Sequence, residues 1–249
     1  MDPLLSSIGV RRYSRPEQLY ELAEACLEHL CLCVRLMREC GAHSSAHPGN
    51  TALRHLLSPS SVLLHELLTH VLGASASLQP AAAERLVAMV QESAAGPAAE
   101  RAVLKLFELL TTVCEGDEAW VDAQQRQQQA VAPLHSLIMR QPAWALQLVQ
   151  FAEPGACPAL QRAAVRMMGF LSTRDATFTH KLLRFQPRRL VYHCAATLAE
   201  TLFDSCAPDD TPTTAGLLLH VMLDNVYLPF PNLAQLLLGY TVHQVRAVC

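Results

Sequence analysis

Apolar side chains recur at steps of three and four residues in one segment of this sequence after another, and single prolines or glycines separate the segments. That spacing places apolar groups on one face of an α-helix, and such a face has to pack against a neighbour. The first segment follows Ser14-Arg15-Pro16-Glu17, which predicts a capping box between Ser14 and Glu17. Its apolar stripe, which ends before Gly41, consists of Leu19, Leu22, Ala23, Cys26, Leu30, Cys33, Val34 and Met37. A chain of such segments is predicted to be all-α.

The composition favours the same fold class. Hydrophobic residues make up 51% of the chain and are dominated by Leu and Ala, while aromatic residues contribute only 6%, a mixture typical of helices. No stretch alternates apolar and polar residues as a half-buried strand does, so no strand is expected. Further helices are predicted at 48–57, 60–72, 80–93, 97–114, 117–139, 142–151, 158–172, 175–185, 187–205, 213–226 and 232–238.

About ten or eleven consecutive helices with short turns suit either a compact bundle or a stack of helix pairs, each pair on the order of 40 residues. Tetratricopeptide and ankyrin signatures are absent from the sequence. We therefore expect an irregular α-solenoid, a HEAT-like or armadillo-like stack of antiparallel helix pairs. No segment has the composition of an interdomain linker, so residues 1–249 are expected to form one continuous solenoid segment.

The charge and the cysteine content of the chain indicate which partners and which cellular compartment to expect. The net charge is −3 and no cluster of Lys and Arg occurs, so no nucleic-acid partner is expected. Every apolar run is interrupted well before the roughly 20 residues that a membrane-spanning helix needs. The N-terminus lacks the pattern of a secretory signal. Nine cysteines and no N-glycosylation acceptor favour an intracellular, reducing compartment.

Candidate catalytic and metal-binding patterns are incomplete. The run from His65 to His70 approaches H-E-x-x-H, but a five-residue step on an α-helix separates the two imidazoles by roughly 140°. Cys26, Cys33 and Cys40 lie about 10 Å apart along one helix, too far to share a zinc ion. No phosphate-binding loop and no nucleophile–base pair is found. We expect no catalytic, cofactor-binding or metal residues, no cofactor and no enzymatic activity.

The residues from Pro231 to Tyr240 read P-N-L-A-Q-L-L-L-G-Y and predict a short capped helix. Asn232 is a natural N-cap for the amide of Gln235, and Gly239 supplies a left-handed stop. The side chains expected to face inward are those of Leu233, Leu236 and Leu237.

The turn before this helix carries three apolar side chains, Tyr227, Leu228 and Phe230. Apolar residues in a turn either pack onto adjacent helices or meet a partner protein. Packing is the favoured interpretation, and the three residues are the candidates for a partner contact. Leu217, Leu218, Val221 and Met222 in the preceding segment are expected to be core residues.

An apolar helix, a short proline-containing turn and this decapeptide occur here in an order that resembles the interior of the largest scaffold nucleoporins of the nuclear pore inner ring. Their corresponding segment is P-N-L-A-x-x-L-L-G followed by Phe or Tyr. The matched positions, with structural roles, are Pro231, Asn232, Leu233, Ala234, Leu237, Leu238, Gly239 and Tyr240. The family continues beyond this point and has extensive solenoid before it, so the resemblance implies that the chain is a fragment or a partial gene model.

The resemblance implies a structural scaffold at the nuclear envelope that supports pore assembly and nucleocytoplasmic transport. Its implied partners are other nucleoporins, including inner-ring linker nucleoporins that place amphipathic peptides in grooves between helices. A soluble, cytosolic HEAT-like adapter that binds helical peptides is the alternative, and an enzyme with an unrecognised site is a remote one.

Overall fold

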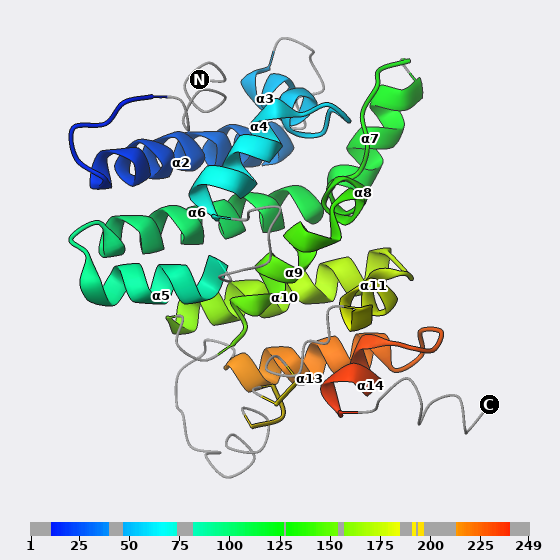
Figure 1. Ribbon diagram of the computed structural model, residues 1–249. Helices are drawn as coiled ribbons and strands as arrows, with labels where there is room; N and C mark the ends of the chain where they lie inside the picture. The colour runs from blue at the N-terminus through cyan, green and yellow to red at the C-terminus, as the bar shows by residue number, and fades with distance from the viewer. Residues whose placement is uncertain are drawn as a thin grey trace. The chain divides into compact units, whose positions relative to one another are not determined.

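The computed structural model describes residues 11–39, 47–73, 82–126, 128–153, 157–184, 191–192, 194–196 and 213–239. Thirteen helical segments have their bounds within these ranges, which contain no strand (Figure 1). The all-α class is confirmed, and the helices slightly outnumber the predicted ten or eleven. The segments are α2 (Glu17–Glu39), α3 (Pro48–Leu56), α4 (Val62–Glu66), η1 (Leu67–Val71), α5 (Ala82–Glu92), α6 (Gly96–Cys114), α7 (Asp117–Arg126), α8 (Leu134–Arg140), α9 (Pro142–Gln150), α10 (Pro158–Arg174), α11 (Phe178–Arg184), α13 (Thr214–Asn225) and α14 (Leu233–Leu237).

The chain folds into two compact units, residues 1–143 and 144–249. In the first unit α2 packs on α6 and on α3, and α5 packs on α6. The predicted stripe of α2 supplies much of this core, although Leu19, Leu22 and Cys33 are only half-buried. The buried residues of α2 are Ala23, Cys26, Leu27, Leu30, Cys31, Val34 and Met37.

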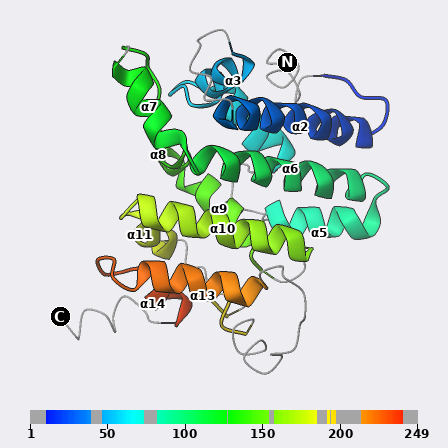
Figure 2. The same ribbon diagram turned by 180° about the vertical axis from the view of Figure 1, so that it is seen from behind.

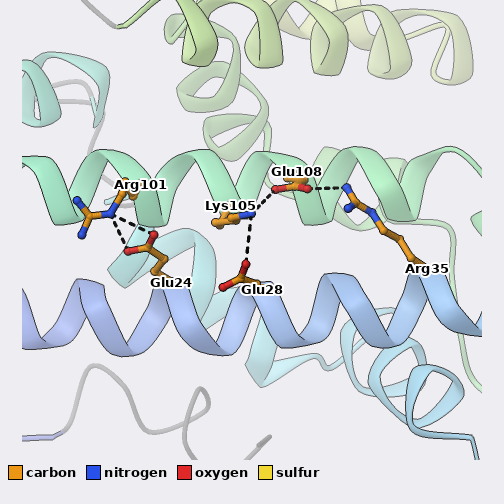
Figure 3. Close-up of polar contacts among 6 residues, drawn as sticks. All are labelled: Glu24, Glu28, Arg35, Arg101, Lys105 and Glu108. Carbon is orange, nitrogen blue, oxygen red and sulfur yellow. Dashed lines mark hydrogen bonds and ion pairs between the residues drawn. The ribbon is translucent and has the colours of Figure 1, made fainter.

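Polar contacts show that α2 and α6 run in the same direction (Figure 3). Residues further along α2 meet residues further along α6: the pairs are Glu24 with Arg101, Glu28 with Lys105 and Arg35 with Glu108. Lys105 also donates to Glu108 at 3.0 Å, which links the last two pairs. At the end of the row the Arg38 guanidinium donates to the carbonyls of Thr112 and Val113. These carbonyls lie in the last turn of α6, where a cation is favoured.

The start of α2 differs in detail from the predicted capping box. The amides of Ser14 and Arg15 both donate to Oε1 of Gln18, at 3.1 and 3.3 Å. Gln18 therefore reaches back to the residues before the helix, in place of the predicted Glu17, whose carboxylate lies 3.8 Å from Arg15.

The predicted helix over residues 117–139 is wrong, because the chain forms two helices, α7 and α8, with a break between them. Pro133 is the N-cap of α8, and its ring nitrogen has no proton to donate within a helix. Gln128 adopts a positive φ of 60° in the break. The fully buried Asp117 holds the two helices together, since its Oδ2 accepts from the amide of Leu134 at 2.6 Å.

The predicted helix over residues 60–72 is confirmed in extent but not in form. It begins as α4, capped by the Ser61 hydroxyl at 3.0 Å from the Leu64 amide, and continues as the π-helix η1. Gly73, at a φ of 77°, ends it as predicted.

In the second unit α10 packs on α13, and α13 packs on α14 (Figures 1 and 2). A β-carbon placed on Gly169 would lie 2.9 Å from Cγ2 of Val221, so the two helices approach closely there. One turn further along both helices, Nδ2 of Asn225 donates to the Ser172 hydroxyl at 2.9 Å. Because both contacts advance together, α10 and α13 run in the same direction.

The segment between these helices is described only in part. The predicted helix over residues 175–185 is present as α11, and Oδ1 of Asp175 accepts from the Thr177 amide at 2.7 Å just before it. The predicted helix over residues 187–205 falls mostly outside the described residues. Within the described ranges, no helix combines the length and the apolar composition that crossing a bilayer requires.

Candidate interaction surface

Helix α13 is fixed at both ends by its own polar side chains. The Thr213 hydroxyl accepts from the Gly216 amide at 3.1 Å and caps the start of the helix. At the other end, the fully buried Asn225 donates to the carbonyl of Val221 at 2.7 Å, in addition to its bond with Ser172. The bond from Asn225 to Ser172 joins this side of α13 to α10.

The short helix α14 has the predicted capping box. Oδ1 of Asn232 accepts from the Gln235 amide at 3.1 Å, and the Gln235 side chain accepts from the Asn232 amide at 3.3 Å. Nδ2 of Asn232 also donates to the Leu228 carbonyl at 3.0 Å, which ties the turn to the helix. A substituted cap of this kind typically costs about 1 kcal/mol of stability.

The remaining motif residues divide between core and surface. The expected inward-facing residues Leu233, Leu236 and Leu237 are buried, as is Ala234, and Gly239 adopts the expected positive φ, here 79°. Pro231 is half-buried and follows a cis peptide bond from Phe230. Leu238 is exposed. Tyr240 lies outside the described residues.

Two of the three turn residues do not pack onto adjacent helices, which was the favoured interpretation of the sequence. Tyr227 is 94% exposed and Phe230 is 60% exposed, while Leu228 is half-buried. The turn is tied to α14 through the bond from Asn232 to the Leu228 carbonyl. Packing on adjacent helices was therefore the wrong prediction for Tyr227 and Phe230.

Sequence reasoning also missed the outward side of α13. Leu218 and Val221 are buried and Leu217 and Met222 are half-buried; Leu219, Leu223 and Val226, however, are exposed. Their positions repeat at four and three residues, which places them on one face of the helix. Apolar residues on both sides of one helix were the available signal for this surface.

Charge is nearly absent from this part of the chain. Asp224, which is exposed near the end of α13, is the single formally charged residue between Thr213 and Gly239. It lies beside the carbonyl end of the helix, where a negative charge is unfavourable. The surface formed by α13, the turn and α14 is thus apolar with one acidic and one imidazole group, since His220 is also exposed.

The incomplete H-E-x-x-H pattern from His65 to His70 lies in α4 and η1. The segment from His65 to His70 enters the π-helix η1, and the Leu72 amide donates to the Leu67 carbonyl in the i to i+5 pattern. The α-helical angle expected between the two imidazoles therefore does not apply. Nε2 of His70 lies 3.4 Å from Oε2 of Glu66. Among the described residues, no three His, Cys, Asp or Glu side chains are grouped so that they could hold a metal ion.

The described cysteines are free thiols. Burial is the main cause that raises the pKa of Cys31 to about 11 and that of Cys194 to about 12. A thiol with a raised pKa is a poor nucleophile at neutral pH because little thiolate is present. Cys33 is half-buried, and Cys40 lies outside the described residues.

No protein-family model matches the chain, and no curated protein matches it.

Proposed function

We propose that this chain is a structural scaffold segment of an inner-ring nucleoporin and acts through protein–protein contacts that support pore assembly and nucleocytoplasmic transport. The observation that carries the proposal is the segment from Pro231 to Tyr240, which resembles the family motif. Asn232 as a cap, Leu233 and Leu237 as core residues and Gly239 as a left-handed stop agree with the structural roles that the resemblance implies.

The proposal includes a continuous solenoid, and the direction of the helices supports it. In a stack of antiparallel helix pairs, equivalent helices of successive pairs run parallel to one another. In the first unit, α2 and α6 are parallel and are separated in sequence by α3, α4, η1 and α5. In the second unit, α10 and α13 are parallel as well. A simple up-and-down bundle would instead place antiparallel helices side by side.

The proposed partners are other nucleoporins, including linker nucleoporins that bind through amphipathic peptides. Contact with proteins suits the exposed apolar side chains of the second unit, such as Leu223, Tyr227 and Phe230. Exposed apolar side chains that gather on one surface commonly mark sites of protein contact. A net charge of −3 gives no support to a nucleic-acid partner.

The test is the location of the endogenous protein. An antibody raised against residues 119–130, a polar segment that includes the end of α7, is used for immunofluorescence, and knockdown of the transcript controls its specificity. Punctate staining of the nuclear rim that disappears on knockdown is expected. Diffuse cytosolic staining with the same control would exclude the pore scaffold and leave the helical-peptide adapter as the better proposal.

A further inference from the structure

The segment before α2 contains two adjacent arginines followed, after one residue, by a serine. Arg11 and Arg12 precede Ser14 by three and two residues, and the pattern of two arginines, any residue and Ser or Thr occurs once in the sequence. Arginine-directed protein kinases select such a pair with carboxylates in the groove that binds the substrate, because one carboxylate can hold a guanidinium through two hydrogen bonds. A four-residue pattern also occurs by chance, so accessibility and backbone conformation decide whether this serine can be used.

The structure leaves all three side chains accessible. Arg11, Arg12 and Ser14 are exposed and lie in the stretch of chain before the first turn of α2 (Figure 1). This helix begins at Glu17, directly after Pro16, and a proline disfavours helical backbone at the residue before it. Ser14 therefore stays outside the helix, in a segment that a kinase groove can bind without unwinding α2.

The fold uses the backbone of Ser14 at the start of α2 instead of its hydroxyl. The sequence predicted this hydroxyl as a helix cap, but it is the Ser14 amide that donates to Oε1 of Gln18, at 3.1 Å. The Arg15 amide donates to the same oxygen at 3.3 Å. Modification of the hydroxyl therefore leaves the groups that form this cap unchanged.

We propose that Ser14 is a phosphorylation site for an arginine-directed protein kinase. In the reaction the catalytic aspartate of the kinase accepts the hydroxyl proton, Oγ of Ser14 forms a bond to the γ-phosphorus of ATP, and the bond from that phosphorus to the leaving oxygen of ADP breaks. The products are phosphoserine and ADP. Arg11 and Arg12 bind the kinase and take no part in the transfer.

Phosphorylation changes the sign pattern of this exposed segment. Residues 11–17 contain three arginines and one glutamate, which gives a net charge of +2. A phosphoserine adds about −1.5 to −2 at pH 7, so modification converts a basic segment into a nearly neutral one. The fold tolerates the new charge, because it lies before the N-terminus of α2, where a negative charge is favourable, and beside the exposed Arg15.

The chain contains a related pattern that serves as an internal comparison. Arg174 precedes Thr177 by three residues, but the residue two before Thr177 is Asp175. The Thr177 hydroxyl donates to Oδ1 of Asp175 at 2.6 Å, and a carboxylate at this position repels the carboxylates of an arginine-directed kinase. We expect Thr177 to stay unmodified under conditions that phosphorylate Ser14.

The first experiment treats the purified full chain with ATP, Mg²⁺ and the catalytic subunit of cAMP-dependent protein kinase, an arginine-directed enzyme. Peptide mass spectrometry should place the phosphate on Ser14, and Ser14→Ala should abolish its incorporation. Ser60→Ala is the matched control, since Ser60 is also exposed but has no arginine in the three residues before it. No incorporation into the parent chain, or incorporation mainly at another residue, would overturn the proposal.

A second pair of variants tests recognition through the arginines. Arg11→Gln together with Arg12→Gln should lower kcat/KM of the kinase for this chain about tenfold or more, because two charge-assisted contacts are lost. Arg126→Gln removes an arginine that is exposed in α7 and should leave kcat/KM unchanged. Circular dichroism verifies that the variants keep the fold. Equal kcat/KM for the double variant and the parent chain would refute the recognition of this pair.

Use of the site in cells is tested on the endogenous protein. The protein is isolated from cells in which the same kinase has been activated and phosphatases inhibited, and Ser14 should then carry phosphate that is missing when the kinase is inhibited. Ser14 without phosphate under activation would refute its use in these cells. These results do not depend on nuclear-rim staining, so failure here and failure of the pore scaffold are distinguishable.

Discussion

Two adjacent leucines at the end of α14 allow the effect of burial on stability to be separated from the effect of residue type. Leu237 is buried and Leu238 is exposed, although they are neighbours in one motif. Leu237→Ala should lower the free energy of unfolding by about 2–5 kcal/mol, since it removes apolar contacts and leaves a cavity. Leu238→Ala should change it by less than about 0.5 kcal/mol. Urea denaturation followed by circular dichroism measures both, and equal losses would contradict the placement of α14.

Asp117 provides a second test at a single residue, because its buried carboxylate accepts from the Leu134 amide across the break between α7 and α8. Asp117→Ala leaves this amide without its acceptor and should cost about 1–3 kcal/mol. Asp117→Asn keeps a carbonyl oxygen in place and should cost less. Thermal melting of the two variants gives the comparison; an alanine variant as stable as the asparagine one would show that the bond contributes nothing.

At the scale of the element, the row of charges between α2 and α6 predicts an acid-sensitive contribution to stability. Partial burial raises the pKa of Glu108, but hydrogen bonds and charges from Lys105 and Arg35 outweigh burial, so the net pKa lies below its ordinary value of 4.5. The unfolded chain then binds a proton at a higher pH than the folded chain does. The contribution is present above the unfolded pKa and is lost as pH falls through the folded pKa.

Glu108→Gln should therefore flatten the pH dependence of stability in this acidic range, by less than about 1 kcal/mol because the carboxylate is partly exposed. Glu28→Gln is the control, since Glu28 is largely exposed and lies 4.0 Å from Lys105. Urea midpoints measured across the acidic range give the two profiles. An unchanged profile for Glu108→Gln would rule out the contribution.

The sequence predicted correctly those structural features that are caused by residues close to one another in the chain. The apolar stripe of α2, the cap at Asn232 and the stops at Gly73 and Gly239 all depend on residues within a few positions of each other. The break before Pro133 was missed because the polar run from Gln124 to Gln129 suits an exposed helical face as well as a loop, while the stabilising bond comes from Asp117, 17 residues before Leu134.

Non-local contacts could not be predicted in the same way. The parallel pairing of α2 with α6 joins Glu24 to Arg101, which are 77 residues apart, and helical periodicity contains no information about such a pair. For the same reason, only part of the candidate surface could be predicted from the sequence. Tyr227 and Phe230 were named from their types and their position in a turn, but how far each is exposed depends on the packing of the surrounding helices, α13 on α10 and α14 on α13.

At the scale of the whole molecule, buried thiols report whether the two compact units unfold together. Cys31 lies in residues 1–143 and Cys194 in residues 144–249, both are buried, and burial raises the pKa of each. Alkylation at about pH 8 should therefore modify them only when their surroundings open. Half-buried Cys33 and Cys157 serve as faster-reacting references.

If residues 1–249 form one continuous solenoid segment, as we propose, stacked neighbours stabilise one another and their unfolding is coupled. Pulsed alkylation across a urea series, read by mass spectrometry for each cysteine, should then give the same midpoint for Cys31 and Cys194. Two well-separated midpoints would mean that the compact units are independent domains, and the proposal of a single solenoid segment would have to be given up. Because each midpoint belongs to one thiol, a single urea series reports on the two compact units separately.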